Sequence, residues 1–237
     1  MAVPKDSSVL ITGASRGIGR SIALECARLL PNPLILLARD GAGLSETAQL
    51  CFEISGKRPQ TECCDLTKAD EVEALVQSGR LNQCGALINN AGYFLPKPVD
   101  ECTIPDYVRQ FEVNALSAIR LTQLMMQILE DKPESRIVFI CSVTAQKGQA
   151  RCGAYSVSKH ALNGYIQSLR EATFETSVGV TSVILGQTFS TSWDGLDVDP
   201  HRLADAADVG RVVATLCTLS SRTCVEEMVI RPQKGDL

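Results

Sequence analysis

Short apolar runs rich in β-branched residues alternate along the chain with longer stretches in which apolar and polar positions recur at helical spacing. The short runs have the length of strands buried on both faces, and the longer stretches have the length of helices that cover a sheet. This alternation predicts a doubly wound α/β fold with helices on both faces of a mainly parallel, seven-stranded sheet. The predicted strands are Ser8–Thr12, Leu34–Ala38, Gln60–Cys64, Ala86–Asn89, Arg136–Cys141, Val180–Leu185 and Glu227–Ile230.

Helical stretches separate these strands. Thr67 and Asp205 precede two of them and are expected to act as N-terminal caps, because a short polar side chain there accepts a hydrogen bond from a free helix amide. Pro31 and Pro33 are expected to end the first helix, since proline has no backbone donor and disfavours helix at the residue before it. The predicted helices, of which the fourth is expected to be bent or broken, are Gly17–Leu30, Leu44–Ser55, Lys68–Ser78, Ile104–Glu130, Tyr155–Ser177 and Ala207–Leu219.

Composition limits the domain organisation and the partners. The chain has 237 residues and no linker, repeat or low-complexity segment, so a single domain spanning residues 1–237 is expected. A net charge of -4 and the absence of a basic stripe argue against a nucleic-acid partner. Apolar runs are too short for a membrane-spanning helix, and Met1 to Ser8 includes Lys5 and Asp6 rather than an apolar signal region, so a cytoplasmic protein is expected.

Ten cysteines and two histidines show no arrangement typical of a metal site, because C-x-x-C spacing and paired Cys/His motifs are absent. Most of the cysteines lie in apolar runs, which predicts reduced core residues. Cys141 and Cys152 fall closest to the reacting residues described below. A redox-sensitive thiol at either position stays open as an alternative.

A glycine-rich segment follows the first strand directly and opens the first helix. Glycine permits a tight turn and close approach of the backbone, and a helix N-terminus offers free amides and a positive dipole to a phosphate. In this position the segment predicts a Rossmann fold that binds the pyrophosphate of a dinucleotide, with Arg16 adding charge for a further phosphate. The predicted contacts are Gly13, Ser15, Arg16, Gly17, Ile18 and Gly19.

The same residues also satisfy G-x-S-x-G, the turn that presents the nucleophilic serine of α/β-hydrolases. Ser15 would then be the nucleophile, but it follows the first strand, so no earlier strand exists to supply an oxyanion loop. The two histidines, His160 and His201, are more simply explained as solvent-facing residues. A serine hydrolase is therefore the less favoured interpretation of this turn.

The end of the second strand, Ala38-Arg39-Asp40, bears on the choice of cofactor. An arginine there suits the 2′-phosphate of NADP, whereas an acidic side chain suits the free 2′-hydroxyl of NAD. Because Arg39 comes first and Arg16 is expected nearby, NADP(H) is favoured. Asp40 keeps NAD(H) open as the alternative.

Tyr155 and Lys159 lie four positions apart on a predicted helix, so their side chains share one face. A phenol has a pKa of about 10, and work near neutrality requires about 4 kcal/mol of differential stabilisation. One ammonium at about 4 Å supplies roughly that energy at an effective dielectric of 20. Ser142 stands at the end of the fifth strand, where its hydroxyl can hold a carbonyl oxygen while the tyrosine donates a proton. These residue types predict carbonyl reduction.

Taken together, the motifs resemble the short-chain dehydrogenase/reductase family across nearly the whole chain. In that resemblance Thr12 to Gly19 is the cofactor turn, Asp65-Leu66 contacts the adenine, and Asn89-Asn90-Ala91-Gly92 is the motif after the fourth strand. The resemblance implies an NADP(H)-dependent oxidoreductase acting on a small-molecule carbonyl or alcohol, in which the cofactor supplies the hydride.

The resemblance also implies a catalytic tetrad of Asn114, Ser142, Tyr155 and Lys159. Tyr155 is expected to be the general acid and Ser142 to orient the carbonyl. Lys159 is expected to lower the pKa of Tyr155 and to hold the nicotinamide ribose, and Asn114 to link Lys159 to solvent through water.

The turn after the sixth strand departs from the family, which usually has Pro-Gly where this chain has Leu185-Gly186. Gly186 keeps the turn possible, and Thr188, Ser190 or Thr191 can still meet the nicotinamide carboxamide. Residues 186–200 are expected to form a lid over the nicotinamide.

Substrate contacts are expected on both walls of the pocket. Trp193, the single tryptophan, can stack on a flat ring or simply pack the lid against the pocket. Gln146, Gln149 and Cys152 are expected on the opposite wall, beside Ser142 and Tyr155.

Residues 192–197 and the ending 225–237 resemble bacterial sepiapterin-reductase-like enzymes, and 3-ketoacyl-(acyl-carrier-protein) reductases are the alternative within the family. A redox sensor that binds NADP(H) without turnover also stays open, although a pure binder has no need of the tetrad. The resemblance further implies a homodimer or homotetramer built on helices Ile104–Glu130 and Tyr155–Ser177.

Overall fold

A computed structural model describes residues 3–193, 195 and 197–236. Asp194 and Leu196 of the predicted lid, and Leu237 of the C-terminal ending, lie outside the described residues.

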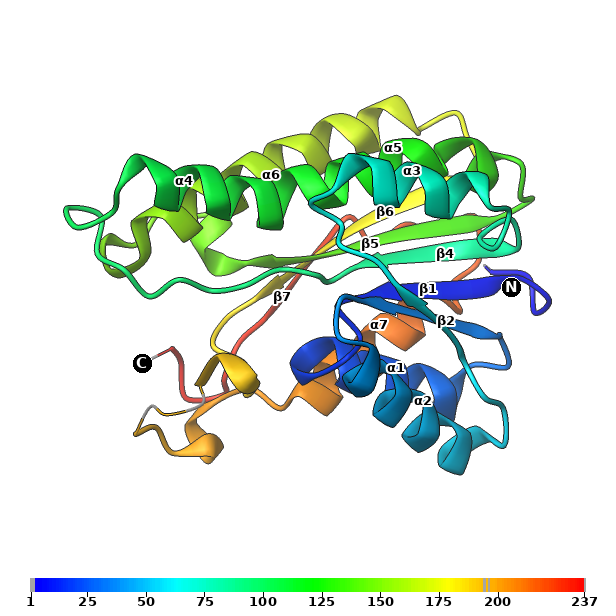
Figure 1. Ribbon diagram of the computed structural model, residues 1–237, viewed down its shortest axis with the longest axis horizontal. Helices are drawn as coiled ribbons and strands as arrows, with labels where there is room; N and C mark the ends of the chain where they lie inside the picture. Colours follow the sequence, from blue (N-terminus) through cyan, green and yellow to red (C-terminus); the bar gives the residue numbers. More distant parts are fainter. Residues whose placement is uncertain (1–2, 194, 196, 237) are drawn as a thin grey trace.

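All seven strands join one parallel sheet in the order β3-β2-β1-β4-β5-β6-β7 (Figure 1). The strand order reverses at β1, which lies between β2 and β4, so the loops that leave β1 and β4 diverge and open a crevice at their carboxyl ends. The strands are β1 (Ser8–Thr12), β2 (Leu34–Ala38), β3 (Gln60–Cys63), β4 (Cys84–Asn89), β5 (Ser135–Ser142), β6 (Val178–Leu185) and β7 (Glu227–Ile230).

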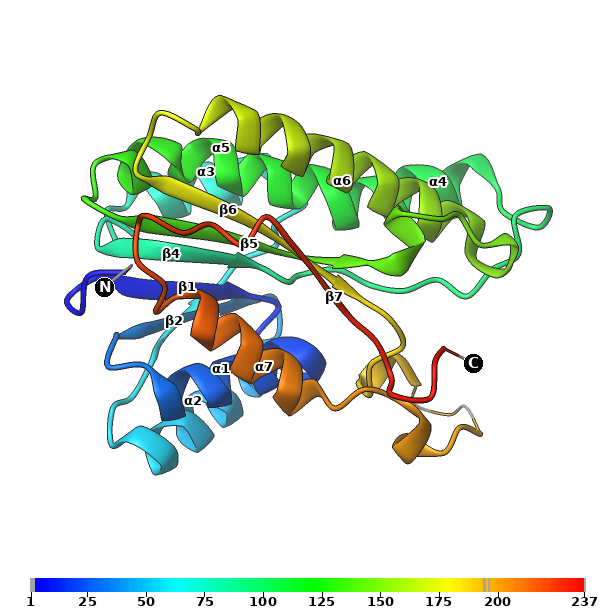
Figure 2. The ribbon, with the colours of Figure 1, turned by 180° about the vertical axis from the view of Figure 1, so that it is seen from behind.

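Helices cover both faces of the sheet, with α1, α2 and α7 on one face and α3, α4, α5 and α6 on the other (Figures 1 and 2). A connection between parallel strands has to run back from the end of one strand to the start of the next. The helices on the two faces of the sheet form these crossover connections. Their bounds are α1 (Gly17–Leu29), α2 (Gly41–Ser55), α3 (Ala69–Gln77), α4 (Ile104–Phe111), α5 (Ser117–Glu130), α6 (Gly153–Ala172) and α7 (Ala206–Leu216).

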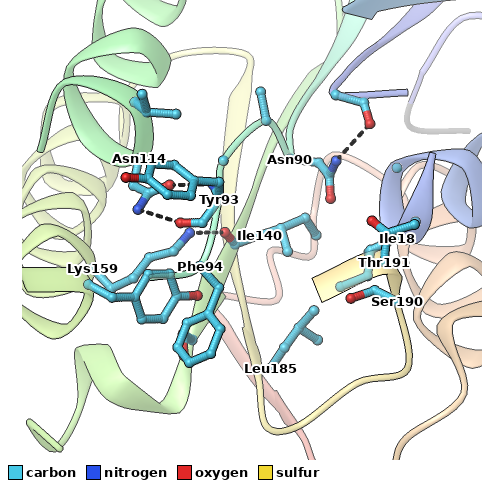
Figure 3. A pocket seen from close by; sticks show the side chains of 18 of the residues that line it. Ile18, Asn90, Tyr93, Phe94, Asn114, Ile140, Lys159, Leu185, Ser190 and Thr191 are labelled. Carbon is cyan, nitrogen blue, oxygen red and sulfur yellow. Dashed lines mark hydrogen bonds between the residues drawn. The ribbon is translucent and has the colours of Figure 1, made fainter. Parts of the chain in front are cut away.

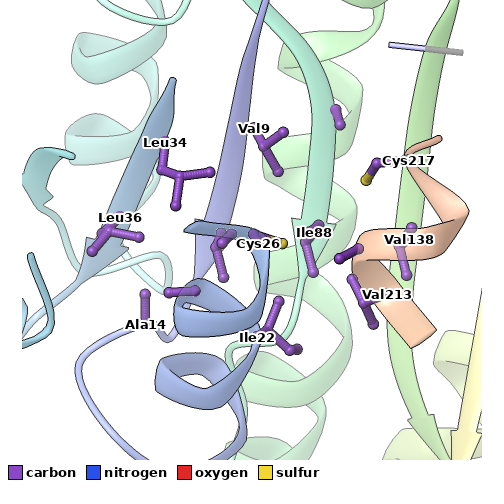
Figure 4. Close-up of a cluster of buried hydrophobic side chains, with 14 of the residues drawn as sticks. Val9, Ala14, Ile22, Cys26, Leu34, Leu36, Ile88, Val138, Val213 and Cys217 are labelled. Atoms are coloured by element: carbon purple, nitrogen blue, oxygen red, sulfur yellow. The ribbon is translucent and has the colours of Figure 1, made fainter. Parts of the chain in front are cut away.

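Two apolar cores lie on opposite faces of the sheet, because successive side chains of a strand point to opposite sides. Val9 and Ile11 of β1 belong to the core packed against α1 and α7, in which Figure 4 shows Val9. Leu10 between them belongs to the core packed against α5 and α6. All three side chains are completely buried. This two-sided burial explains why the strands read as continuous apolar runs in the sequence.

The predicted break in helix Ile104–Glu130 is confirmed, since a π-helical turn at Glu112–Leu116 separates α4 from α5. Two other expectations are wrong at helix ends. Thr67 does not cap α3, because its hydroxyl donates to the carboxylate of Asp65 instead. Helix α6 ends at Ala172 rather than Ser177, since the Thr173 and Thr176 hydroxyls bond backbone carbonyl oxygens in a non-helical turn.

Asp205 caps α7 as expected, its carboxylate accepting from the amide of Ala207 at 2.8 Å. The first helix ends before Pro31, also as expected. Among the described residues, no helix is both long and apolar enough to span a membrane.

Candidate functional site

A cleft of about 1370 Å³ runs along the carboxyl ends of the strands. That volume exceeds the roughly 300–1,000 Å³ of a pocket for one drug-sized ligand, so a dinucleotide and a small substrate fit together. Every residue expected to touch cofactor or substrate lines it, except Gln146, which is exposed and lies elsewhere. The lining includes Gly13, Ser15, Arg16, Gly17, Ile18, Gly19, Arg39, Asp65, Leu66, Asn90, Ala91, Gly92, Asn114, Ser142, Gln149, Cys152, Tyr155, Lys159, Gly186, Thr188 and Trp193.

The glycine turn needs glycine for two different reasons. Gly13 and Gly17 have φ values of +67° and +55°, a region that residues with a Cβ rarely adopt. A Cβ on Gly19 would lie only 2.1 Å from the carbonyl oxygen of Gly13. The turn can therefore fold back on itself only with these residues.

The start of α1 fits an anionic group. Its N-cap residue, Arg16, makes no side-chain capping bond, and no acidic side chain occupies the first helical turn. The first amides of a helix have no partner within the helix, and here they face the cleft beside Arg16. This arrangement suits the pyrophosphate of a dinucleotide.

Polar side chains brace the turn from two sides. Thr12 Oγ1 accepts from the backbone amides of Asn90 and Ala91 at 3.0 Å each, and the side-chain Nδ2 of Asn90 donates to the Thr12 carbonyl oxygen at 2.9 Å. Arg20 donates to the Ser15 carbonyl oxygen at 2.6 Å and forms an ion pair with Glu46 of α2. The side chain of Asn90 thus holds the turn itself.

The adenosine end of the cleft separates the two residues that left the cofactor choice open. Asp40 Oδ1 accepts from the amide of Gly43 at 3.1 Å and caps the N-terminus of α2. Arg39 is exposed and lies 3.8 Å from the carboxylate of Asp65. Burial acts to raise the pKa of Asp65, but hydrogen bonds from Thr67 and the Arg39 charge outweigh it and lower the pKa. Asp40 is therefore engaged as a helix cap, whereas the Arg39 guanidinium stays exposed on the cleft wall beside Asp65.

Ser142 and Tyr155 line the same part of the cleft, and hydrogen bonding from Ser142 acts to lower the pKa of Tyr155. Ser142 ends β5 and is buried, and its Oγ accepts from the Thr144 amide at 3.2 Å and from the Thr144 hydroxyl at 3.0 Å. Burial raises the pKa of Tyr155 well above its usual value, and the bond with Ser142 lowers it only in part. The phenol is thus held protonated, which suits a proton donor.

Lys159 shares the expected helix face but not the expected electrostatic effect. Its Nζ lies 5.8 Å from the centre of the Tyr155 ring and donates to the Ile140 carbonyl oxygen at 3.1 Å (Figure 3). Burial lowers the pKa of Lys159 and raises that of Tyr155. Desolvation is the largest cause for both groups, and the Lys159 charge is not among the causes that shift the pKa of Tyr155.

Asn114 lies in the π-helical turn, and its side chain forms hydrogen bonds with the backbone of the loop that follows β4. Its Oδ1 accepts from the amide of Tyr93 at 2.8 Å, and its Nδ2 donates to the Tyr93 carbonyl oxygen at 3.1 Å (Figure 3). A Cβ on Gly92 would lie 2.8 Å from that Oδ1. Phe94, which follows Tyr93 in this loop, packs edge-on against the Tyr155 ring with the ring centroids 5.0 Å apart.

The remaining cleft residues form the walls beside Tyr155. Trp193 donates its indole N–H to the Thr188 carbonyl oxygen at 2.9 Å, and Thr188 donates its hydroxyl to the Gly186 carbonyl oxygen at 3.2 Å. Gln149 accepts from Arg151 at 3.1 Å, and Cys152 is buried nearby. Across the cleft, Ser190 and Thr191 lie close to Ile18 of the cofactor turn (Figure 3).

Thr144, Phe94 and Asp236 are among the cleft residues that sequence reasoning did not single out. Thr144 carries a signal, since a threonine two positions after a strand-ending serine can turn back onto its hydroxyl. Phe94 and Asp236 carry none, because their contacts are made with distant parts of the chain.

The serine-hydrolase alternative finds no support in this geometry. Ser15 lines the cleft, but His160 and His201 are not among the described residues that line it, so neither histidine is placed to act as a base for Ser15. His160 is placed with its Nδ1 2.9 Å from the Ser156 carbonyl oxygen.

The cysteines are free thiols, of which seven are buried, one is half-buried, and Cys63 and Cys224 are exposed. The expectation of core cysteines is wrong for those two, because Cys63 ends the edge strand β3 and Cys224 lies in the segment before the edge strand β7. In the described part of the chain, no group of three or more His, Cys, Asp or Glu side chains could hold a metal ion.

The fold and the site together define a dinucleotide-binding protein of the Rossmann type, with a serine, a tyrosine and a lysine gathered where the nicotinamide end of the cleft is expected. A family model described as short chain dehydrogenase matches residues 7–197. The chain belongs to the short-chain dehydrogenase family, whose members are oxidoreductases.

Three similar proteins illustrate the range of that family. A sepiapterin reductase of Chlorobaculum tepidum is 29% identical over 97% of both chains. A ketoacyl reductase of a Nostoc species is 30% identical over 81% of this chain and 66% of its own. A Shigella flexneri chain described as a short-chain dehydrogenase, solved with NADP, has a TM-score of 0.86 and 27% identity, covering 94% of this chain and 96% of its own.

Proposed function

We propose that the chain is an NADP(H)-dependent carbonyl reductase that uses Tyr155 as its proton donor. The gathering of Ser142, Tyr155 and the buried Lys159 in the same cleft as the glycine turn carries this proposal. The relatives named as reductases and the NADP complex of the Shigella chain add support.

NADP(H) is favoured over NAD(H) by the charges at the adenosine end. The carboxylate of Asp40 already accepts a hydrogen bond as the N-cap of α2, so it is poorly placed to bind a free ribose hydroxyl. Arg39 and Arg16 are exposed cations on the cleft wall, and a guanidinium pairs well with the 2′-phosphate. The free amides at the start of α1 would hold the pyrophosphate.

In the proposed reaction, the bound cofactor supplies a hydride to the carbonyl carbon of the substrate. Tyr155 Oη gives its proton to the carbonyl oxygen as that oxygen gains negative charge. Ser142 Oγ holds the same oxygen, because its own proton is free to donate once Thr144 has filled its acceptor sites. The Lys159 ammonium stabilises the resulting phenolate, and Asn114 keeps the neighbouring loop in place.

The substrate is proposed to be a small carbonyl compound with a flat, conjugated body, as in sepiapterin. Phe94 fixes one aromatic edge against Tyr155, and Trp193 provides a second ring whose orientation is set by Thr188. A 3-ketoacyl thioester is the second candidate, which the ketoacyl reductase relative favours. We also propose that the enzyme works as a homodimer or homotetramer.

The test follows the loss of NADPH absorbance with four carbonyl probes: sepiapterin, a vicinal dicarbonyl, a β-ketoacyl thioester and an aromatic aldehyde. Tyr155→Phe is expected to lower kcat by about 10²- to 10⁴-fold, the usual contribution of a positioned general acid, while NADPH still binds. Tyr165→Phe is the matched control, because Tyr165 lies outside the cleft and packs its ring against Phe139. NADH in place of NADPH is expected to react more slowly.

Each result has a separate meaning. Turnover of NADPH that survives Tyr155→Phe would exclude the proposed proton donor. Binding without turnover of any probe would replace the reductase with a nucleotide sensor, and no binding of either nucleotide would overturn the proposal. A β-ketoacyl thioester as the fastest probe would select the second candidate.

A further inference from the structure

The C-terminal segment returns to the cleft after β7. Pro232 and Gly235 close a turn in which the Gly235 amide donates to the Pro232 carbonyl oxygen at 2.9 Å, and Gly235 has a φ of +80° that glycine adopts without strain. The reversal brings Asp236 back against the loop that leaves β6. Asp236 consequently lines the cleft, although it is 49 positions from Gln187 in the sequence.

Both carboxylate oxygens of Asp236 are engaged there. Oδ1 accepts from the backbone amide of Gln187 at 3.0 Å, and Oδ2 accepts from the Arg231 guanidinium at 2.7 Å. The Asp236 side chain is only 16% exposed, whereas that of Arg231 is 50% exposed. A carboxylate that is largely buried and accepts two hydrogen bonds is held in one position. It therefore fixes the loop that begins at Gly186 and Gln187.

Gly186 makes the close approach possible. A Cβ at this position would lie 2.5 Å from Asp236 Oδ1 and 3.0 Å from Arg231 Cγ. The Gly186 amide itself donates to the Ile230 carbonyl oxygen at 2.7 Å, which extends the pairing of β6 with β7. The loop is therefore held at Gly186 by β7 and at Gln187 by the segment beyond β7.

The anchored loop leads directly to the nicotinamide end of the cleft. Thr188 is buried and bonds Gly186 through its hydroxyl, and Trp193 bonds the Thr188 carbonyl oxygen. Position 185 holds leucine, so no proline ring restricts the backbone at the start of this loop. The restraint has to come from contacts with the rest of the protein.

We propose that Asp236, held by Arg231, is a positioning residue that sets the Gly186–Thr188 loop against the nicotinamide half of the bound cofactor. The proposal rests on the proposed function for the identity of that cofactor. Since the carboxylate grips the loop and not the adenosine end, its loss should weaken the binding of the nicotinamide half alone. The nicotinamide ring, which donates the hydride, should also be held less firmly in its reactive orientation.

The experiment compares dissociation constants for NADPH and for adenosine 2′,5′-bisphosphate, which carries the adenosine half and lacks the nicotinamide. Asp236→Ala is expected to weaken NADPH binding by about tenfold, the range of one charge-assisted hydrogen bond, and to leave the bisphosphate unchanged. Asp236→Asn keeps an oxygen that can accept from Gln187 and loses the charge, so an intermediate effect is expected.

Trp193 gives a second readout that needs no ligand. It is the single tryptophan, and its indole donates to the same loop, so Asp236→Ala is expected to shift its emission maximum. Asp208→Asn is the matched control, because it removes an exposed Asp–Arg pair with Arg211 that lies away from the main cleft. The control should change neither the emission nor the binding of either nucleotide.

Equal weakening of NADPH and bisphosphate binding would show a general loss of structure, and it would overturn the inference. Unchanged NADPH binding and unchanged emission in Asp236→Ala would also overturn it, while the proposed function would stand if the wild-type chain turns over. A wild-type chain that binds neither nucleotide would overturn both. Thermal unfolding of each variant identifies one that has simply failed to fold.

Discussion

At the scale of single residues, the direction in which Ser142 donates its hydroxyl proton depends on which lone pairs of its oxygen already accept hydrogen bonds. Ser142 Oγ can accept two hydrogen bonds, and Thr144 supplies both, one from its amide and one from its hydroxyl. The proton of Ser142 is then left to point toward Tyr155. This explains why Ser142 acts to lower the pKa of Tyr155 against the stronger effect of burial.

Thr144→Val tests that arrangement. The variant loses the hydroxyl donor and keeps the amide donor, so the Ser142 proton is less firmly directed and the pKa of Tyr155 should rise further. Alcohol oxidation needs the deprotonated phenol, so its rate increases with pH, and the midpoint of that increase should move upward by about 0.7 units if one hydrogen bond of about 1 kcal/mol is lost. Thr144→Ser, which retains a hydroxyl, should restore the wild-type profile. An unchanged midpoint in the valine variant would exclude this role.

At the scale of elements, the starts of two helices define the dinucleotide end of the cleft in opposite ways. The N-terminus of α1 has no side-chain cap and is left open to an anion, whereas that of α2 is closed by Asp40. Arg20 joins the two helices through Glu46 and the Ser15 carbonyl oxygen. The glycine turn is therefore fixed by helix–helix contacts as well as by its own backbone.

Asp40→Ala separates the capping role from recognition of a ribose. Loss of the cap should lower the free energy of unfolding by about 1 kcal/mol, measured by urea unfolding, and Asp40→Ser should recover most of it because serine is also a good N-cap. The ratio of kcat/KM for NADPH to that for NADH should stay unchanged in both variants. A selective loss of NADH activity in both variants would instead assign Asp40 to the ribose.

At the scale of the whole molecule, helices α4 and α6 present apolar side chains outward. Ile104, Val108 and Val157 are 75%, 60% and 53% exposed. The two helices pack beside each other on one face of the sheet (Figures 1 and 2). Apolar side chains that stay in water on neighbouring helices are typical of a surface that another copy covers.

The double variant Ile104→Glu, Val108→Glu should therefore lower the mass in solution to that of one chain, as measured by sedimentation. Two charges buried against a partner carry a desolvation cost that an exposed face does not impose. Phe174→Glu is the control, since Phe174 is 67% exposed but follows the end of α6. A wild-type mass equal to one chain would contradict the proposed oligomer.

The sequence by itself determined the strands, the glycine turn and the shared helix face of Tyr155 and Lys159, because periodicity and turn chemistry act over a few neighbouring residues. The strand predictions β1, β2 and β7 match the structure at both ends, and the turn is formed by the residues expected. The sequence around Asp40 left two roles open for its carboxylate, a contact with the cofactor ribose or a helix cap. Only the hydrogen bond from the Gly43 amide, seen in the structure, decided for the cap.

Tertiary structure decided what depends on burial and on strand order. The pKa of Tyr155 follows from its burial beside Phe94, which no spacing in the sequence reveals. Asp236 meets Gln187 because β7 pairs with β6 and a turn reverses the chain beyond it. Contacts of this kind join segments that are far apart in sequence, so they exist only once the sheet has set which loops share its carboxyl edge.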